Sequence, residues 1–181
     1  MRKKMMAYGF AMLVGGAPFG GAWAADLCGG MLMPAAQLKQ VSRGVSKTHS
    51  GLDLTAPYGS PVRAALGGTV IFTGTYFGYG RMVDIRHADG IVTRYGHLAS
   101  FAAGIKPGAT VDAGGLLGAV GTSGHAHGPH LHFEVRVDGH AIDPKPYLGL
   151  AACQMAPRLG VEPLEEARAP ERLPPRDARP K

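Results

Sequence analysis

The sequence predicts a single, mainly antiparallel all-β domain with the form of a compact barrel or sandwich. Short β-type runs recur between glycine-bearing turns from Thr69 to Val137, a pattern typical of antiparallel sheets rather than of alternating helices and strands. The 181 residues suit about one domain, and the 28 glycines disfavour long helices. We therefore expect no helix longer than a turn or two in this region.

Six runs are expected to form the main strands: 61–65, 68–73, 81–87, 91–97, 116–120 and 130–137. Asp89-Gly90 suits the positive φ of a hairpin turn between the third and fourth of these runs. Segments 104–108 and 111–117 resemble further turn and strand pieces. Residues 31–45 are expected to hold one short helix that ends near Gly44.

The two ends of the chain differ in composition from the middle. Residues 1–24 have a cationic start, an apolar stretch and an Ala22-Trp23-Ala24 cleavage motif, which predicts an export signal and a mature chain from Ala25. Five glycines and prolines interrupt the apolar run, which argues against a membrane anchor. We expect an exported protein, periplasmic or secreted, with no integral membrane segment after signal removal.

The rest of the chain divides into a short segment 25–48, a domain 49–153 and a tail 154–181. Residues 157–181 contain six prolines, six basic and five acidic residues and few large apolar side chains, which predicts a disordered tail. Cys28 and Cys153 flank the domain, and in an oxidising compartment they are expected to form one disulfide. Two unrelated thiols are the alternative.

The formal net charge of +6 gives little information about partners. Without Arg2, Lys3 and Lys4 of the signal segment, 16 basic residues face 13 acidic ones. This surplus is small and scattered, whereas nucleic-acid binding needs a basic stripe. Nucleic acid is therefore not an expected partner.

The histidines carry the chemical signal. In the run 130–137, Leu131 and Phe133 alternate with His130, His132 and Glu134, so the two imidazoles share the face opposite the core and line a cleft.

His49 and Asp53 flank Gly51, a residue that lets the backbone bend so that both side chains reach one ion, although this spacing alone is weak evidence. His97 ends another expected strand. A catalytic zinc site needs three His or carboxylate ligands from the protein and leaves one coordination position open for water.

The sequence resembles the lysostaphin-like, or LytM-type, zinc endopeptidases that cut peptide cross-links of bacterial cell walls. The resemblance covers about residues 49–147 and rests on an ordered set of motifs: His49-Ser50-Gly51-Leu52-Asp53-Leu54, Ala56 with Gly59-Ser60-Pro61-Val62, Gly78-Tyr79-Gly80, Thr93-Arg94-Tyr95-Gly96-His97-Leu98, Gly128-Pro129-His130-Leu131-His132-Phe133-Glu134-Val135-Arg136, and Asp143-Pro144.

The resemblance implies that His49, Asp53 and His132 bind one Zn²⁺ per chain. It implies that His97 and His130 act on the substrate, a peptidoglycan peptide. His130 would serve as general base, and His97 would stabilise the oxyanion or assist the leaving amine.

Several alternatives stay open. Tyr79 and Tyr95 are candidates for substrate contact or for packing. The loop His125-Ala126-His127 departs from the family, and a variable cleft rim is favoured over an auxiliary metal site. A non-catalytic activator of a cell-wall amidase is the rival function, and a zinc-buffering protein is a second. The sequence leaves open whether a D-Ala to diaminopimelate bond or a glycine bridge is cut.

Overall fold

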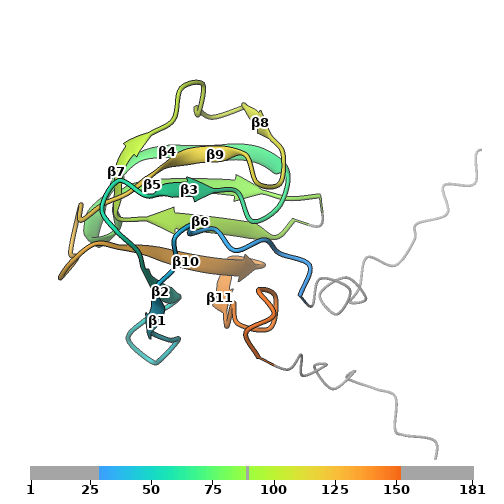
Figure 1. Ribbon diagram of the computed structural model, residues 1–181. Coiled ribbons are helices and arrows are strands. Elements are labelled where there is room, and N and C mark those ends of the chain that lie inside the picture. Colours follow the sequence, from blue (N-terminus) through green and yellow to red (C-terminus); the bar gives the residue numbers. More distant parts are fainter. Residues whose placement is uncertain (1–28, 89, 152–181) are drawn as a thin grey trace, which may run out of the picture.

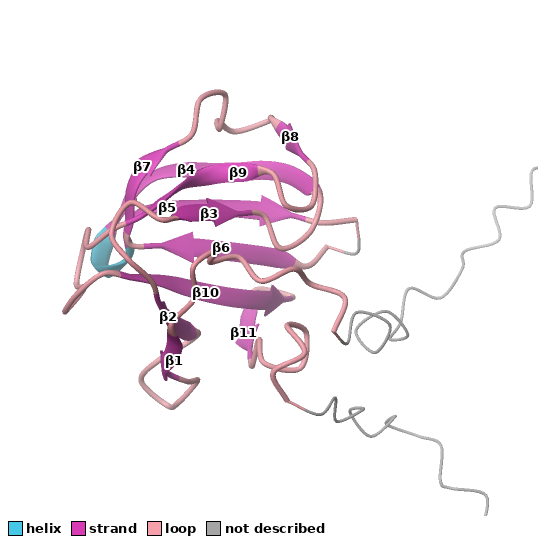
Figure 2. Ribbon diagram, viewed as in Figure 1, coloured by secondary structure: helices cyan, strands magenta, loops and turns pink. Residues whose placement is uncertain are grey.

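The computed structural model describes residues 29–88 and 90–151, and the regular secondary structure of this part of the chain is almost entirely β-strand (Figures 1 and 2). The strands are β1 (Gln40–Arg43), β2 (Leu52–Thr55), β3 (Pro61–Arg63), β4 (Gly68–Tyr76), β5 (Gly80–Arg86), β6 (Val92–Gly96), β7 (Leu98–Phe101), β8 (Thr110–Val111), β9 (Leu116–Val120), β10 (His130–Val137) and β11 (His140–Ile142). A short 3₁₀ turn, Phe77–Tyr79, joins β4 to β5.

The strands form two antiparallel sheets. The larger sheet has the order β1-β2-β10-β6-β5-β4-β8, with β11 paired to β10, and the smaller has the order β3-β9-β7. Every ladder between named strands is antiparallel. The expected all-β, mainly antiparallel fold is confirmed.

One apolar core joins the two sheets. Leu54 of β2 and Phe133 of β10 belong to the same buried cluster as Val62 of β3, Leu98 of β7 and Leu117 of β9, and each of these side chains has no exposed surface. The sheets therefore pack as a sandwich, and burial of these side chains is the main favourable contribution to folding.

The six expected strands are confirmed, with ends that differ by no more than three residues. The expected hairpin joins β5 to β6: the His87 N–H donates to the Ile91 carbonyl at 2.8 Å, and Gly90 has φ +75°. Strands β1, β2, β7 and β11 were not expected, because runs of three or four residues are too short to display a period.

The short helix expected within 31–45 is wrong. Residues Gln40–Arg43 form β1 at the edge of the larger sheet, and the Lys39 N–H donates to the Thr55 carbonyl at 2.8 Å. Met31 and Ala35, four residues apart, are both buried in the core from a non-helical segment. Their helix-like spacing therefore reflects two separate core contacts of an irregular chain.

Three predictions lie outside the described residues: the signal segment 1–24, the Cys28–Cys153 disulfide and the tail 154–181. Within the described part, no helix has the length and apolar character needed to cross a membrane.

Candidate metal centre

Strands β2 and β10 bring two of the predicted ligands together. Asp53 lies directly opposite His132 in the β2–β10 ladder, so both side chains project from the same face of the sheet. His49 precedes β2 in a tight turn, in which the backbones of Ser46 and His49 exchange hydrogen bonds of 2.9 and 3.2 Å. The ladder register thus brings together Asp53 and His132, which are 79 positions apart in the sequence.

The close approach of this turn to β10 requires Gly51. A Cβ at this position would lie 2.4 Å from the Phe133 carbonyl oxygen and 3.0 Å from His132 Nε2. Gly51 does not adopt a left-handed φ. Its role is therefore to leave space beside β10. The bending role expected from the sequence is not what requires a glycine here.

Three ligand-type atoms converge at one point. His49 Nε2 lies 3.0 Å from Asp53 Oδ1, His132 Nδ1 lies 2.9 Å from the same oxygen, and the two nitrogens are 3.1 Å apart. The three residues are only 4 to 7% exposed. Among the described residues, they form the only group of three or more His, Cys, Asp or Glu side chains whose ligand atoms all lie within 4.8 Å of one another.

The outer nitrogens of both imidazoles determine which inner nitrogens carry lone pairs. His49 Nδ1 donates to the Gly44 carbonyl at 2.8 Å, and His132 Nε2 donates to Glu134 Oε1 at 3.0 Å. In the neutral rings, His49 Nε2 and His132 Nδ1 then have lone pairs directed toward each other and toward the Asp53 carboxylate. Three converging electron-pair donors repel one another unless a cation or proton lies between them.

This arrangement fits a zinc ion. Zinc binds imidazole nitrogen and carboxylate oxygen at about 2.0–2.2 Å, and tetrahedral ligands at that range are about 3.3 Å apart. The observed separations of 2.9 to 3.1 Å are close to this value. In the metal-free chain, where a proton takes the place of a cation between these atoms, burial opposes ionisation of Asp53, but the hydrogen bond with protonated His132 and the positive charges of His130 and His49 outweigh burial and lower the pKa of Asp53 to about 2. The ligand carboxylate is therefore ionised at neutral pH.

His97 and His130 stand beside this group, and each is anchored by one ring nitrogen. His97 Nδ1 donates to the Ser123 carbonyl at 2.7 Å, and His130 Nδ1 donates to the Gly128 carbonyl at 2.9 Å. The two ring centres are 4.7 Å apart. His130 Nε2 lies 3.5 Å from Asp53 Oδ1. In the neutral rings the free Nε2 atoms are acceptors.

The backbone of His97 is unusual, with a φ of +61° that non-glycine residues seldom adopt. Its N–H donates to the Tyr79 carbonyl at 2.8 Å, which helps to hold this conformation. Burial lowers the pKa of His97 to about 4, although the hydrogen bond to Ser123 opposes the shift. His97 is therefore neutral at physiological pH.

Glu134 is a site residue to which sequence reasoning gave no role. Its side chain has no exposed surface, and its Oε1 accepts from His132 Nε2, from the Tyr79 hydroxyl at 2.8 Å and from Ser50 Oγ. Arg136 donates to Oε2. Burial alone would raise its pKa, but these hydrogen bonds lower it to about 2. The alternation of the run 130–137 had already placed Glu134 on the same face as His132, which was the available signal.

Tyr79 belongs to the same network. Its half-buried ring lies 5.4 Å from the His132 ring, and the Arg94 guanidinium stacks 4.7 Å above its centre. Arg94 is itself held by Asp84 through two hydrogen bonds of 2.8 and 2.9 Å. Tyr79 thus supports the ligand histidine through Glu134.

Tyr95 packs in the core, which is one of the two roles that the sequence left open for it. It is fully buried, and its hydroxyl accepts from the Ala65 N–H at 2.8 Å and bonds the Thr93 hydroxyl at 2.9 Å. Burial raises its pKa to about 12. Because no part of the side chain reaches the surface, the predicted substrate contact is not available to it.

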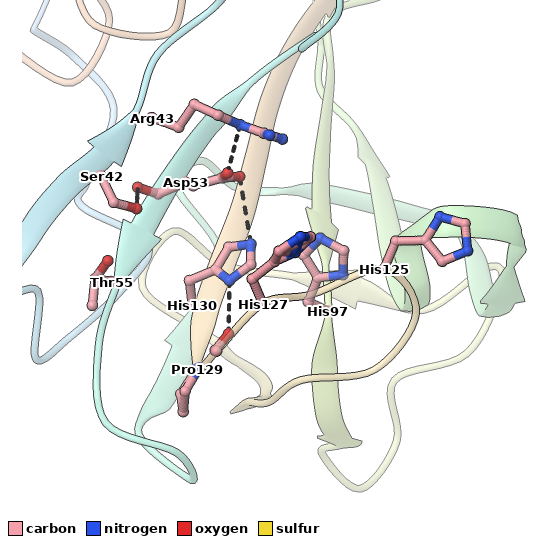
Figure 3. A pocket seen from close by; sticks show the side chains of 10 residues that line it. Ser42, Arg43, Asp53, Thr55, His97, His125, His127, Pro129 and His130 are labelled. Carbon is pink, nitrogen blue, oxygen red and sulfur yellow. Dashed lines mark hydrogen bonds and ion pairs between the residues drawn. The ribbon is translucent and has the colours of Figure 1, made fainter.

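A pocket of about 430 Å³ opens beside Asp53, His97 and His130. Figure 3 shows the imidazoles on one side of this pocket and Arg43 on the other. His125 and His127 are exposed and also line it. Neither belongs to the close ligand group, so their position agrees with the cleft-rim alternative.

The arrangement agrees with comparisons of the sequence. Residues 47–144, more than half of the chain, match peptidase family M23. This chain belongs to peptidase family M23. The matched residues include the three that converge, as well as His97, His130 and Glu134, and the expected resemblance to lysostaphin-like peptidases is confirmed.

Relatives of this M23 domain include named cell-wall enzymes. It is 43% identical over 98 residues to "DD-carboxypeptidase/endopeptidase Mpg" of Neisseria meningitidis and 36% identical over 95 residues to "Peptidoglycan DD-endopeptidase ShyA" of Vibrio cholerae. These alignments cover 54% and 52% of this chain and 22% of each relative. The chain thus spans about a fifth of the length of these relatives.

The fold is shared with a solved structure of the family. The catalytic domain of lysostaphin from Staphylococcus simulans superposes with a TM-score of 0.53 at 29% sequence identity, covering 62% of this chain and 89% of that domain. M23 peptidases are generally zinc-dependent, and the matched residues of this chain include the His-Asp-His group described above.

Proposed function

We propose that this chain is a zinc-dependent endopeptidase that hydrolyses peptide bonds in bacterial peptidoglycan cross-links. The observation that carries the proposal is the convergence of His49 Nε2, His132 Nδ1 and Asp53 Oδ1, each oriented by its outer contacts so that a lone pair faces a common point. Two neutral imidazoles and one carboxylate leave a divalent ion with a net charge of +1.

His49, Asp53 and His132 would hold the ion, one per chain. When bound, zinc supplies Lewis-acid chemistry that acidifies water and polarises a carbonyl group. Glu134 keeps His132 in the tautomer with the lone pair on Nδ1, because its carboxylate needs the proton on Nε2.

His130 is the proposed general base. The Gly128 carbonyl holds the proton of its Nδ1, so that Nε2 offers a lone pair on the pocket side, next to the ligand carboxylate. A base in this position can take a proton from an attacking water, a role that typically contributes about 10²–10⁴ in rate.

His97 is the proposed partner for the leaving amine. Stabilising an oxyanion requires a proton on Nε2, whereas the pKa of about 4 and the Nδ1–H bond to Ser123 keep that nitrogen unprotonated. His97 would instead accept through Nε2 the second proton of the attacking water, after His130 has taken the first, and pass it to the leaving amine. The amine also takes the proton held by His130, so that the products are a carboxylate and an ammonium. Of the two roles considered for His97, stabilising the oxyanion or assisting the leaving amine, its neutral tautomer favours the second.

The proposed substrate follows from the relatives and the pocket. Two relatives carry endopeptidase activity in their names, and the pocket of about 430 Å³ opens beside the residues proposed for catalysis. Peptidoglycan lies outside the cytoplasmic membrane, and the predicted export signal agrees with that location. We propose that the mature chain is periplasmic or secreted.

The rival proposal is a non-catalytic activator of a cell-wall amidase. An activator does not need ligands or a base, and yet all five positions of the site hold residues of the required types. This completeness supports the enzyme over the activator.

Mass spectrometry of purified cross-linked muropeptides tests the proposal. The zinc-loaded mature chain should release new peptides, whereas a chelated sample and the His130→Ala variant should not. One zinc per chain is expected, and two or more would favour the zinc-buffering alternative. A sample with one bound zinc that cleaves nothing would overturn the enzyme and favour the activator.

A further inference from the structure

The two oxygens of Asp53 face different partners. Oδ1 faces the imidazoles of His49 and His132, while Oδ2 lies 3.0 Å from Nε of Arg43. Arg43 is the last residue of β1. One carboxylate therefore separates its guanidinium from the point where the ligand atoms converge.

The rest of the guanidinium is available for another ligand. The side chain of Arg43 is 62% exposed and lines the pocket that also contains His97 and His130. Within the part of the chain that the structure describes, the ion pair with Asp53, closest at Nε, is the one side-chain interaction of Arg43, and its two terminal nitrogens donate no hydrogen bond. In Figure 3 the guanidinium lies beside the Asp53 carboxylate, and a dashed line joins the two groups.

The charge of the pocket suits an anion. Its described lining contains one acidic side chain, Asp53, and that carboxylate already faces Arg43 and the imidazoles of His49, His130 and His132. A divalent ion at the centre would add positive charge. A planar guanidinium with two terminal NH₂ groups matches the geometry of a carboxylate.

Peptide bonds differ in whether a carboxylate lies next to them. In the interior of an ordinary peptide or a glycine bridge, the carbon that carries the scissile amine is followed by another amide. In a cross-link to the side chain of diaminopimelate, that carbon carries a free carboxylate, and the same is true of a C-terminal residue. The first group of substrates is neutral at this position and the second is anionic.

We propose that Arg43 is a specificity-determining residue that binds a free carboxylate on the carbon bearing the scissile amine. The proposal rests on the proposed endopeptidase function and deepens it by naming the chemical feature that the pocket selects. Arg43 would hold Asp53 through Nε and the substrate carboxylate through its terminal nitrogens. Substrate recognition would then be coupled directly to the ligand carboxylate.

Two substrates that differ in one group test the proposal. One is a muropeptide dimer linked from D-Ala to diaminopimelate with the adjacent carboxylate free, and the other is the same dimer with that carboxylate amidated. The proteins are the zinc-loaded chain, Arg43→Gln and the matched control Arg86→Gln. Arg86 is exposed at the end of β5, at the opposite end of the sheet from Gly96 and His97.

The parent chain and Arg86→Gln should favour the free acid over the amide by about tenfold or more in kcat/KM, as charge-assisted hydrogen bonds do. Arg43→Gln should lose more of its rate on the free acid than on the amide, so that the preference of the parent chain disappears. If Arg43 served only to position Asp53, both substrates would suffer equally and the zinc content would fall. Equal losses, or no preference in the parent chain, would overturn the proposal while leaving the endopeptidase intact.

Failure of the endopeptidase itself has a different signature. If the parent chain binds one zinc and cleaves neither dimer, calorimetric titration with the two uncleaved dimers still tests Arg43. Tighter binding of the free acid, lost in Arg43→Gln and kept in Arg86→Gln, would support the subsite without the reaction. Equal binding of both dimers would contradict it.

Discussion

Asp53 and His132 face each other across the β2–β10 ladder, with His132 Nδ1 2.9 Å from Asp53 Oδ1. His132 donates through its other nitrogen to the buried Glu134, and Asp53 holds Arg43 through its other oxygen. Each of the two residues thus has one atom at the centre of the site and one atom anchored away from it. This double attachment is what orients a site whose parts come from distant segments of the chain.

Substitutions of the metal ligands and of the general base should separate metal binding from catalysis. Asp53→Ala and His132→Ala should lose zinc and activity together. His130→Ala should keep one zinc and lose activity by about 10²–10⁴-fold, because it removes a proton acceptor and not a ligand. Metal analysis after gel filtration and a muropeptide assay measure the two quantities. Zinc loss in His130→Ala would contradict the assignment within the His130-Leu131-His132 motif.

Glu134→Gln should weaken zinc binding by about 10–100-fold, since a carboxylate that holds a ligand imidazole raises its basicity and fixes its tautomer. Competition with a chromophoric chelator measures this affinity without reference to activity. Asp112→Asn, the same change of acid to amide in an exposed loop, is the control and should leave affinity unchanged. Unaltered affinity in Glu134→Gln would show that the network does not support the ligand.

Glu134 should also contribute to the acid sensitivity of the metal-free chain. Its pKa falls from 4.5 to about 2 on folding, so the stabilisation is complete above about 4.5 and is lost as the pH falls toward 2. The difference in unfolding free energy between the parent chain and Glu134→Gln should therefore narrow over this range. Denaturant titrations followed by circular dichroism, with chelator present, give this difference. A constant gap would argue against an ionised Glu134 in the folded chain.

His97 should remain neutral through the physiological range. Its pKa falls from 6.5 to about 4 on folding, so its imidazole ¹⁵N signals should not titrate between pH 5 and 8. Below about 6.5 the unfolded chain takes up a proton that the folded chain refuses, and the contribution of this residue to stability should decline as the pH falls toward 4. A midpoint near 6.5 for the His97 signals would contradict the burial argument.

Tyr95→Phe should lower stability without changing substrate recognition. The change leaves the buried Ala65 N–H without its acceptor, which costs about 1–3 kcal/mol. Calorimetry should show the loss, while KM for a muropeptide dimer should stay the same, because Tyr95 has no exposed surface. Tyr79→Phe is the matched comparison: it removes a donor to Glu134 and should weaken zinc binding. A selective rise of KM in Tyr95→Phe would restore the substrate-contact alternative.

Much of the fold could be predicted from local patterns. The alternation in residues 130–137 placed Leu131 and Phe133 in the core and His130 and His132 on the other face, and β10 shows this arrangement. The residues 31–45 could not be predicted in this way. Met31 and Ala35 have helical spacing but are buried separately, and β1 forms because the edge of β2 offers it hydrogen bonds.

The sequence by itself determined the antiparallel β fold, the shared face of His130 and His132, and, through its family resemblance, the five candidate residues of the site. Only the tertiary structure decided which ring nitrogens face the centre, that Glu134 is buried and ionised, that Tyr95 packs in the core, and that Arg43 reaches the pocket. The reason is physical. Periodicity records which side of a strand a residue occupies, whereas tautomers, pKa values and ion pairs depend on partners that ladder register and burial bring from distant parts of the chain.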